Sequence, residues 1–159
     1  MTTYLRDFQG PNCFLSNFQE VVVTLDGASY PTTEHAYQAA KTLNLAERKE
    51  IEISPTPGKA KRLGQRVDMR SDWDAVKAAI MWDLTVQKFD LHTNPRLAQK
   101  LLETGTRLLV EGNTWHDNYW GVCHCGGTPE RPQCLRGAPG QNWLGRLLTL
   151  RRSQLLLQA

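Results

Sequence analysis

The sequence predicts an α+β fold, a single compact domain over residues 1–159 that is mainly helical with a small β-sheet or hairpin. Three observations support this fold class. A chain of 159 residues with 40% hydrophobic content suits one buried core. A run of β-branched residues leads to Asp26-Gly27, a pair suited to a tight hairpin turn. Most of the remaining chain has helical periodicity between capping residues and prolines.

The elements follow in order along the chain. VVVTLDGASY predicts the hairpin. Caps and prolines then predict three helices: from Thr32 or Thr33 through Lys41 to about Asn44, over residues 46–53, and from Pro55 to about Gly64. Three further helices are predicted over about 72–91 with Ser71 or Asp72 as cap, from Asn94 to about Gly105, and over about 142–156. LLVEG predicts a short strand, and the Gly- and Pro-rich segment 116–141 predicts a long loop.

Composition and charge narrow the class of protein. The start, MTTYLRDFQG, lacks the apolar run of a signal peptide, and no segment approaches the roughly 20 apolar residues of a membrane span. We therefore expect a cytoplasmic protein without a membrane partner. The net charge of +3 argues against a nucleic-acid-binding structural protein and is compatible with an anionic ligand.

The helix in TTEHAYQAAK carries an unusual polar stripe. Glu34, Gln38 and Lys41 are spaced at i, i+4 and i+7, so they share one helix face. Taken alone, this stripe is typical of a solvated face with favourable charges at each helix end. The alanines on another stripe of the helix and the extra polar side chains weaken that interpretation and leave a functional site open. A glutamate in the first turn is also held ionised by the helix dipole, as an electrostatic stabiliser or general base requires.

Several segments in register resemble one known family. They are NCFLSNF, TTEHAYQAAK, SPTPGKAKRLGQRV, TGTRLLVEG, DNYWG and QNWLGRLL. In this order they resemble the NADAR family, also called YbiA-like proteins, over nearly the whole chain. The resemblance implies an N-glycosidase that acts on ADP-ribose-like or ribosyl-phosphate compounds, with two activities: removal of ADP-ribose from guanine in nucleic acid, and hydrolysis of early riboflavin-pathway intermediates. The chain departs from the family pattern at Thr149, commonly Met, and in the cysteine-bearing insert after Gly121.

The implied reaction assigns three catalytic candidates. Cleavage of a C1′–N bond builds positive charge on the ribose, which the Glu34 carboxylate would stabilise. Lys41 has two roles open to it: a cationic clamp on phosphate or a ribose hydroxyl, or a neutral amine that attacks C1′ and forms a Schiff base. The amine role is preferred. Asp117 would orient water or a ribose hydroxyl, although an Asp in a turn also serves as a local cap.

The resemblance also implies substrate-binding residues. Lys61 and Gly64 match a phosphate-side element, whereas Lys59 and Arg62 are interpreted as solvated charges of the same helix. Lys88 and Phe89 match the family too, and their helical context predicts a solvated charge and a packed ring. His35 is expected to be a hydrogen-bonded helix residue beside the site. The remaining substrate-binding candidates are Asn17, Phe18, Gln38, Trp120 and Asn142; Trp120 could instead belong to the core, and Asn142 could cap the last helix.

Three cysteines lie close together in the long loop. Thiolates and imidazole are preferred zinc ligands, so a structural zinc site at Cys123, Cys125 and Cys134 is one interpretation, with His124 as a further candidate. The spacing is not that of a zinc finger, and the adjacent Cys-His-Cys positions do not point easily at one metal. Ordinary thiols are the alternative. The implied chemistry requires no cofactor.

A second class of function shares the same residues. A module that binds ADP-ribose or a nucleotide without turnover would use the same pocket. Only the enzyme needs both Glu34 and Lys41 at the anomeric carbon.

Overall fold

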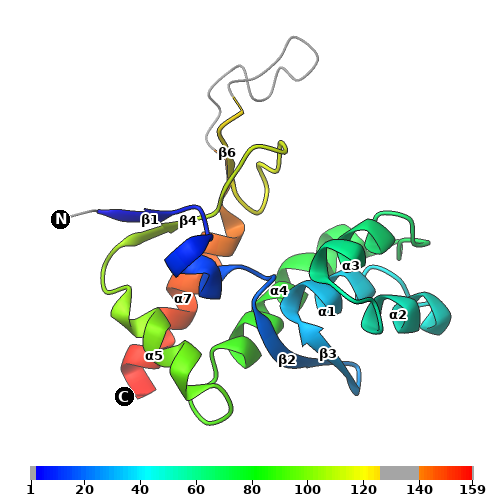
Figure 1. Ribbon diagram of the computed structural model, residues 1–159, viewed down its shortest axis with the longest axis horizontal. Helices are drawn as coiled ribbons and strands as arrows, with labels where there is room; N and C mark the ends of the chain where they lie inside the picture. The colour runs from blue at the N-terminus through cyan, green and yellow to red at the C-terminus, as the bar shows by residue number, and fades with distance from the viewer. Residues whose placement is uncertain (1–2, 126–139, 159) are drawn as a thin grey trace. The chain divides into compact units, whose positions relative to one another are not determined.

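The computed structural model describes residues 3–125 and 140–158 (Figure 1). The chain divides into two units, one of residues 16–98 and one of residues 1–15 with 99–159. Helices predominate, and the described strands pair two by two, which confirms the predicted α+β class. No helix in the described part of the chain is both long and apolar enough to cross a membrane.

The hairpin opens the unit of residues 16–98. Strands β2 (Glu20–Leu25) and β3 (Ala28–Thr32) pair in antiparallel fashion, with Thr24 opposite Ser29. Asp26 and Gly27 have φ values of 50° and 84°, the left-handed conformation that a tight hairpin turn requires. Val21, Val23 and Tyr30 are buried because alternate residues of a strand point to the same face. The hairpin prediction is confirmed.

Helix α1 (Thr33–Ala39) follows the hairpin directly. Thr32 is its N-cap, and the Thr32 hydroxyl accepts a hydrogen bond from the His35 backbone N–H. The helix contacts β2 and β3 and also three later helices, alongside which Figure 1 draws it. All seven of its residues are buried. Ala36 and Ala39 are fully buried, and their small side chains allow this close packing from several directions.

Three helices pack around α1 in the same unit: α2 (Leu45–Glu52), α3 (Pro57–Gly64) and α4 (Trp73–Lys88). Asn44 caps α2, and Thr56 caps α3 with Pro57 in its first turn, so α3 begins two residues after the predicted Pro55. Asp72 is the N-cap of α4, which confirms one of the two predicted positions. Its side chain makes no capping bond, and both of its carboxylate oxygens accept hydrogen bonds from the Arg70 guanidinium.

The end of α4 is also earlier than predicted. The helix stops at Lys88 because Asp90 Oδ1 accepts the backbone N–H groups of His92 and Thr93, which closes a turn. Asn94 Nδ2 then donates to the Gln87 carbonyl near the end of the helix. Local side-chain bonds here replace the helical ones that the periodicity predicted.

The other unit contains two parallel strand pairs and the C-terminal helix. β1 (Tyr4–Arg6) pairs with β4 (Leu108–Val110), and β5 (Gly112–Asn113) pairs with β6 (Val122–Cys123). A short 3-10 helix η1 (Gly10–Leu15) follows β1. Helix α7 (Trp143–Gln158) contacts β4, and its buried leucines contribute to the core of this unit. The division of the chain between residues 98 and 99 falls within helix α5 (Pro95–Glu103).

Candidate functional site

The polar stripe of α1 is buried. The exposed fractions are 6% for Glu34, 4% for Gln38 and 1% for His35. The interpretation of this stripe as a solvated face is therefore wrong for Glu34 and Gln38. The cause is tertiary, because α2, α3, α4 and the hairpin all contact this short helix. Polar groups held in such an environment interact strongly with one another and with any bound ligand.

Glu34 and Gln38 form a hydrogen-bonded pair. Gln38 Nε2 donates to Glu34 Oε1 at 2.8 Å, across one turn of the helix. The Glu34 backbone N–H donates to the Asn17 carbonyl at 3.0 Å, so the segment before the hairpin also fixes the start of α1. One carboxylate oxygen of Glu34 is thereby oriented by a neutral amide donor.

Gly64 at the end of α3 lies directly against Gln38. A Cβ atom at this position would come within 2.1 Å of Gln38 Oε1 and 2.8 Å of Gln38 Cβ. Any larger residue would displace the Gln38 side chain, so the close approach requires glycine. Gln38 Oε1 is buried and has no hydrogen-bond partner among the described residues. Sequence reasoning proposed Gly64 as a substrate-binding residue, and the structure adds this packing role.

Lys41 follows α1 and is half-buried. Burial lowers the pKa of its ammonium group, the charge of nearby Lys61 lowers that pKa as well, and Glu34 raises it. The amine lies 5.8 Å from the centre of the Tyr37 ring, which in turn packs against Trp73 with ring centres 5.1 Å apart. Glu34, Lys41 and Lys61 therefore interact electrostatically within one unit, as their assignment to one site requires.

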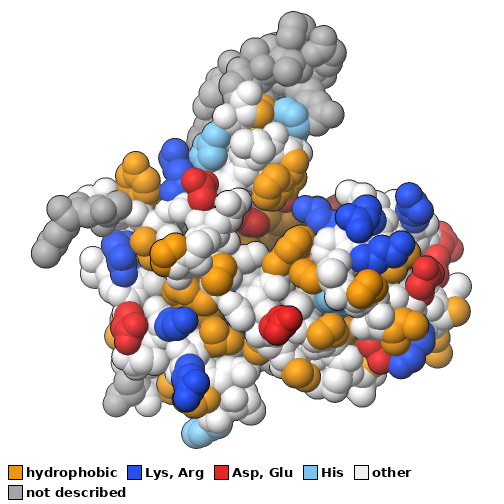
Figure 2. Space-filling view, in the orientation of Figure 1, with side chains coloured by type: hydrophobic (Ala, Val, Ile, Leu, Met, Phe, Trp, Pro, Cys, Tyr) orange, Lys and Arg blue, Asp and Glu red, His pale blue; other side chains and the backbone are white. Residues whose placement is uncertain are grey.

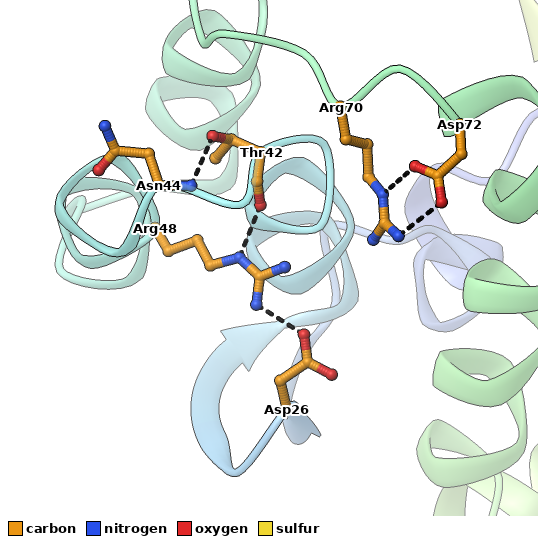
Figure 3. Close-up of polar contacts among 6 residues, drawn as sticks. All are labelled: Asp26, Thr42, Asn44, Arg48, Arg70 and Asp72. Atoms are coloured by element: carbon orange, nitrogen blue, oxygen red, sulfur yellow. Dashed lines mark hydrogen bonds and ion pairs between the residues drawn. The ribbon is translucent and has the colours of Figure 1, made fainter.

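The backbone around Lys41 is held by two arginines. The Lys41 carbonyl accepts the Arg70 backbone N–H at 2.7 Å, and the Thr42 carbonyl accepts Arg48 Nε at 2.7 Å. Arg48 also pairs with Asp26 at 2.6 Å, as Figure 3 shows beside the Arg70–Asp72 pair. The helix was predicted to continue to Asn44. It ends at Ala39, after which the Lys41 and Thr42 N–H groups donate to the carbonyls three residues earlier instead of four.

The two arginines also border a cavity of about 460 Å³ in this unit, which sequence reasoning did not find. No local pattern in the sequence distinguishes Arg48 or Arg70 from the other arginines of the chain. Asp26 of the hairpin turn also lines the cavity, but it is far from both arginines along the chain. The sequence therefore does not show that these three residues lie around one cavity. The other lining residues are Thr24, Leu25, Asp26, Ala40, Val76, Ala79, Ile80, Asp83, Leu84 and Gln87.

The other candidates of this unit lie in three places. The Asn17 side chain donates to Met81 Sδ at 3.5 Å, and Phe18 is 43% exposed, so its ring is available for contact. Lys61 is half-buried on α3, whereas Lys59 and Arg62 are exposed, as predicted. His35 is confirmed as a hydrogen-bonded helix residue, with Nδ1 2.7 Å from the Thr32 hydroxyl and Nε2 3.1 Å from the Ser54 carbonyl.

The prediction of a solvated charge at Lys88 is wrong. Lys88 is 2% exposed, and its Nζ donates to the Ser16 carbonyl at 2.6 Å. Phe89 is fully buried, which confirms the predicted packing of its ring. Lys88 therefore fixes the backbone immediately before Asn17, a role that appears only once α4 is folded against this segment.

Asp117, Trp120 and Asn142 belong to the other unit. Asp117 Oδ1 accepts the backbone N–H groups of Tyr119 and Trp120, so this carboxylate closes a turn. Trp120 is half-buried, with its ring edge-on to Tyr119 at 4.9 Å. Asn142 Oδ1 accepts from the Glu111 N–H and its Nδ2 donates to the Leu109 carbonyl, which joins the loop before α7 to β4. Their catalytic and substrate-binding roles stay predictions.

A group that could bind a metal occurs in this second unit. Its members are His116, Cys123 and Cys125, whose ligand atoms all lie within 4.8 Å of one another. Sequence reasoning included the two cysteines and missed His116. It considered His124 instead, but His124 Nε2 lies 3.7 Å from Asp7 Oδ1. Cys134 lies outside the described residues.

The comparisons with known proteins agree with this architecture. Residues 3–156 match the NADAR domain family model. The chain is 35% identical to the N-glycosidase YbiA of Escherichia coli (strain K12), over 90% of this chain and 81% of that protein. It is 32% identical to an N-glycosidase of Nostoc punctiforme, over 98% of this chain and 93% of the relative.

One plant relative and one solved structure extend the comparison. A chloroplastic riboflavin biosynthesis protein of Zea mays is 34% identical over 82% of this chain, which covers 20% of that longer protein. The NMR structure of E. coli YbiA superimposes with a TM-score of 0.76 and 31% identity, over 99% of this chain and 87% of the other. Sequence and fold therefore point to the same set of relatives.

Proposed function

The chain belongs to the NADAR family and is an N-glycosidase, and on that premise we propose that it cleaves the ribose C1′–N bond of a phosphorylated ribosyl compound at Glu34 and Lys41. One observation carries the proposal: Lys41 is half-buried near the buried Glu34 carboxylate, and burial lowers the pKa of Lys41 against the smaller, opposing effect of Glu34. A carboxylate and an amine in such an environment suit the two demands of the reaction, charge stabilisation and nucleophilic attack.

Glu34 acts by electrostatics. As the C1′–N bond breaks, positive charge develops at C1′ and O4′ of the ribose, and a fixed carboxylate lowers the energy of that transition state. The hydrogen bond from Gln38 and the fixed start of α1 hold the carboxylate in place before the substrate arrives. The buried Gln38 oxygen, which lacks a partner among the described residues, offers an acceptor to a ribose hydroxyl.

Lys41 acts as the nucleophile. Burial favours the neutral amine, whose nitrogen forms a bond to C1′ while the bond from C1′ to the leaving nitrogen breaks. The leaving group takes one proton from the Lys41 nitrogen, and the second N–H proton moves to O4′ as the ring opens, which gives an imine between Lys41 and the sugar. Water then adds to C1′, which releases the free sugar and restores the amine. The net reaction consumes one water molecule.

The anionic part of the substrate is assigned to α3. Lys61 is half-buried there, and Lys59 and Arg62 are exposed on the same helix. Figure 2 shows Lys and Arg side chains gathered over the part of the molecule where Figure 1 draws α3. Cationic side chains of this kind attract phosphate. This arrangement favours a phosphorylated sugar over an unmodified nucleoside.

Borohydride trapping tests the Lys41 role. Borohydride added during turnover should reduce the imine and leave the sugar on the protein, and mass spectrometry should place the added mass on Lys41. Lys41→Arg keeps the cation but cannot act as a neutral nucleophile, so it should lose trapping and nearly all turnover. Lys59→Arg, which changes an exposed lysine of α3, is the matched control and should trap normally. Substantial turnover by Lys41→Arg without any trapped species would leave Lys41 as an electrostatic clamp.

Two substrates compete within the proposed class. Resemblance to the family implies both ADP-ribose attached to guanine in nucleic acid and an early intermediate of riboflavin biosynthesis, and the name of the Zea mays riboflavin biosynthesis protein supports the second. Each is incubated separately with the protein and with Glu34→Gln, and the products are followed by mass spectrometry. We expect cleavage of at least one substrate and a loss of about 100-fold or more in Glu34→Gln, roughly 2.7 kcal/mol. Binding of either substrate without cleavage would favour the non-catalytic module.

A further inference from the structure

Three metal-ligating side chains meet in the unit of residues 1–15 and 99–159, apart from the residues assigned to catalysis. His116 Nδ1 lies 3.3 Å from Cys125 Sγ and 3.9 Å from Cys123 Sγ. All three residues are half-buried, and none of the described cysteines forms a disulfide. The group therefore combines two sulfur ligands and one imidazole ligand, the ligand types that zinc prefers.

The strand pairing explains how the group forms. β5 and β6 run parallel, with Asn113 opposite Cys123, and the His124 backbone N–H continues the pairing by donating to the Asn113 carbonyl at 2.7 Å. Residues two apart in an extended segment point to the same face, which places Cys123 and Cys125 together. The Cys125 N–H lies 3.4 Å from Cys123 Sγ and donates to it. Such a donor stabilises a thiolate.

The loop between the strands brings His116 back to the cysteines. Asn113 and Asp117 bond to each other twice, at 2.7 Å and 3.1 Å, which closes the loop across His116. His116 itself has a φ of 69°, the left-handed conformation that a non-glycine residue adopts at some cost. In this loop the His116 Nδ1 lies within 3.9 Å of both sulfur atoms.

We propose that His116, Cys123 and Cys125 bind one Zn²⁺ ion, which ties the loop after β5 to the end of β6. A tetrahedral zinc ion with bonds of about 2.3 Å to sulfur and about 2.0 Å to nitrogen separates those two ligand atoms by about 3.5 Å. The observed separations of 3.3 Å and 3.9 Å fall on either side of this value. The described ligands fill three positions of the tetrahedron. The site contains neither Glu34 nor Lys41, so zinc binding here is independent of the proposed function.

His124 supplies a matched control. It lies between the two cysteines in the sequence, yet its Nε2 is directed to Asp7, 3.7 Å away. The alternation of an extended segment accounts for this, since the residue between two on one face points to the other. Replacement of His124 should therefore leave the metal site intact, whereas replacement of His116 should not.

Cobalt titration tests the proposal. The full-length protein is stripped with a chelator under reducing conditions and titrated with Co²⁺, whose thiolate charge-transfer absorption reports sulfur ligation. Zinc should then displace the cobalt with a stoichiometry near one per chain. We expect His116→Ala, Cys123→Ser and Cys125→Ser to weaken binding by about 100-fold or more. His124→Ala and Cys13→Ser should bind like the wild type, and far-UV circular dichroism confirms that each variant is folded.

Two results would overturn the site. Absence of the charge-transfer band in the folded wild-type protein would exclude thiolate ligation of a divalent metal. Equal binding by His116→Ala and the wild type, or a loss confined to His124→Ala, would show that His116 is not a ligand. Elemental analysis of protein purified without chelator gives a second readout, in which about one zinc per chain is expected for the wild type and for His124→Ala.

Discussion

Gly64→Ala tests the packing that positions the carboxylate of Glu34. The new methyl group would lie 2.1 Å from Gln38 Oε1 and 2.9 Å from Gln38 Cδ, well inside ordinary contact distance. Gln38 must therefore move by more than about 1 Å, since ordinary contacts of this kind are at about 3.5 Å or longer. Its 2.8 Å hydrogen bond to Glu34 cannot survive such a displacement unchanged.

The expected cost follows from two opposing effects. Overpacking a filled site costs about 1–3 kcal/mol, and a lost hydrogen bond to a charged group adds about 1.5–3 kcal/mol where no other donor replaces it. Replacing glycine by alanine in a helix gains at most about 1 kcal/mol. We expect a net loss of at least about 1.5 kcal/mol in the free energy of unfolding, or a fall in Tm of about 3 °C or more for a chain of this size. Activity should fall as well, because Glu34 loses its orienting partner.

Gly58→Ala in the same helix is the matched control. A Cβ atom there would meet only Arg62 Nη1 at 3.9 Å, an ordinary contact, so stability should stay within about 0.5–1 kcal/mol of the wild type. Denaturant unfolding and initial rates are measured for both variants. In a Gln38→Ala background the cost of Gly64→Ala should shrink, because two of the three crowded atoms are gone. If Gly64→Ala matched Gly58→Ala in stability and rate, the contact between Gly64 and Gln38 would have no part in positioning Glu34.

Two further predictions concern pH. Because burial lowers the pKa of Lys41, kcat/KM should rise with pH through a pKa below the ordinary lysine value of about 10.4 as the neutral amine forms. If kcat/KM instead decreased as the pH rose through that pKa, and if this decrease were absent in Lys41→Arg, Lys41 would act as a cationic clamp. Burial also lowers the pKa of His35, against a smaller opposing effect of its bond to Ser54. Below about pH 6.5 the unfolded chain therefore binds more protons at His35 than the folded protein does. The free energy of unfolding should decrease as the pH is lowered from about 6.5, until the pH falls below the folded-state pKa of His35. His35→Gln should flatten this dependence in denaturant titrations, and an unchanged slope would contradict it.

Local features of the fold were predictable from the sequence. The turn at Asp26-Gly27 depends on residues that tolerate positive φ, and the start of α1 depends on one threonine hydroxyl, so both follow from neighbouring residues. The ends of α1 and α4 were placed too late. After α1 the backbone N–H groups of Lys41 and Thr42 donate to carbonyls three residues earlier, and side-chain turn bonds follow α4, in each case against a continuing helical pattern.

The candidate site divides in the same way. The sequence by itself determined the family, the polar stripe of Glu34, Gln38 and Lys41, and the two cysteines, because motifs and helical spacing are properties of neighbouring residues. Only the tertiary structure decided that the stripe is buried and that His116, rather than His124, faces those cysteines. Burial and ligand geometry depend on which distant segments pack together. The helical period shows which residues share a face of the helix, but not which segments pack against that face. The strand period places His124 on the face opposite Cys123 and Cys125, but it does not show that the loop with His116 returns to the face of the cysteines.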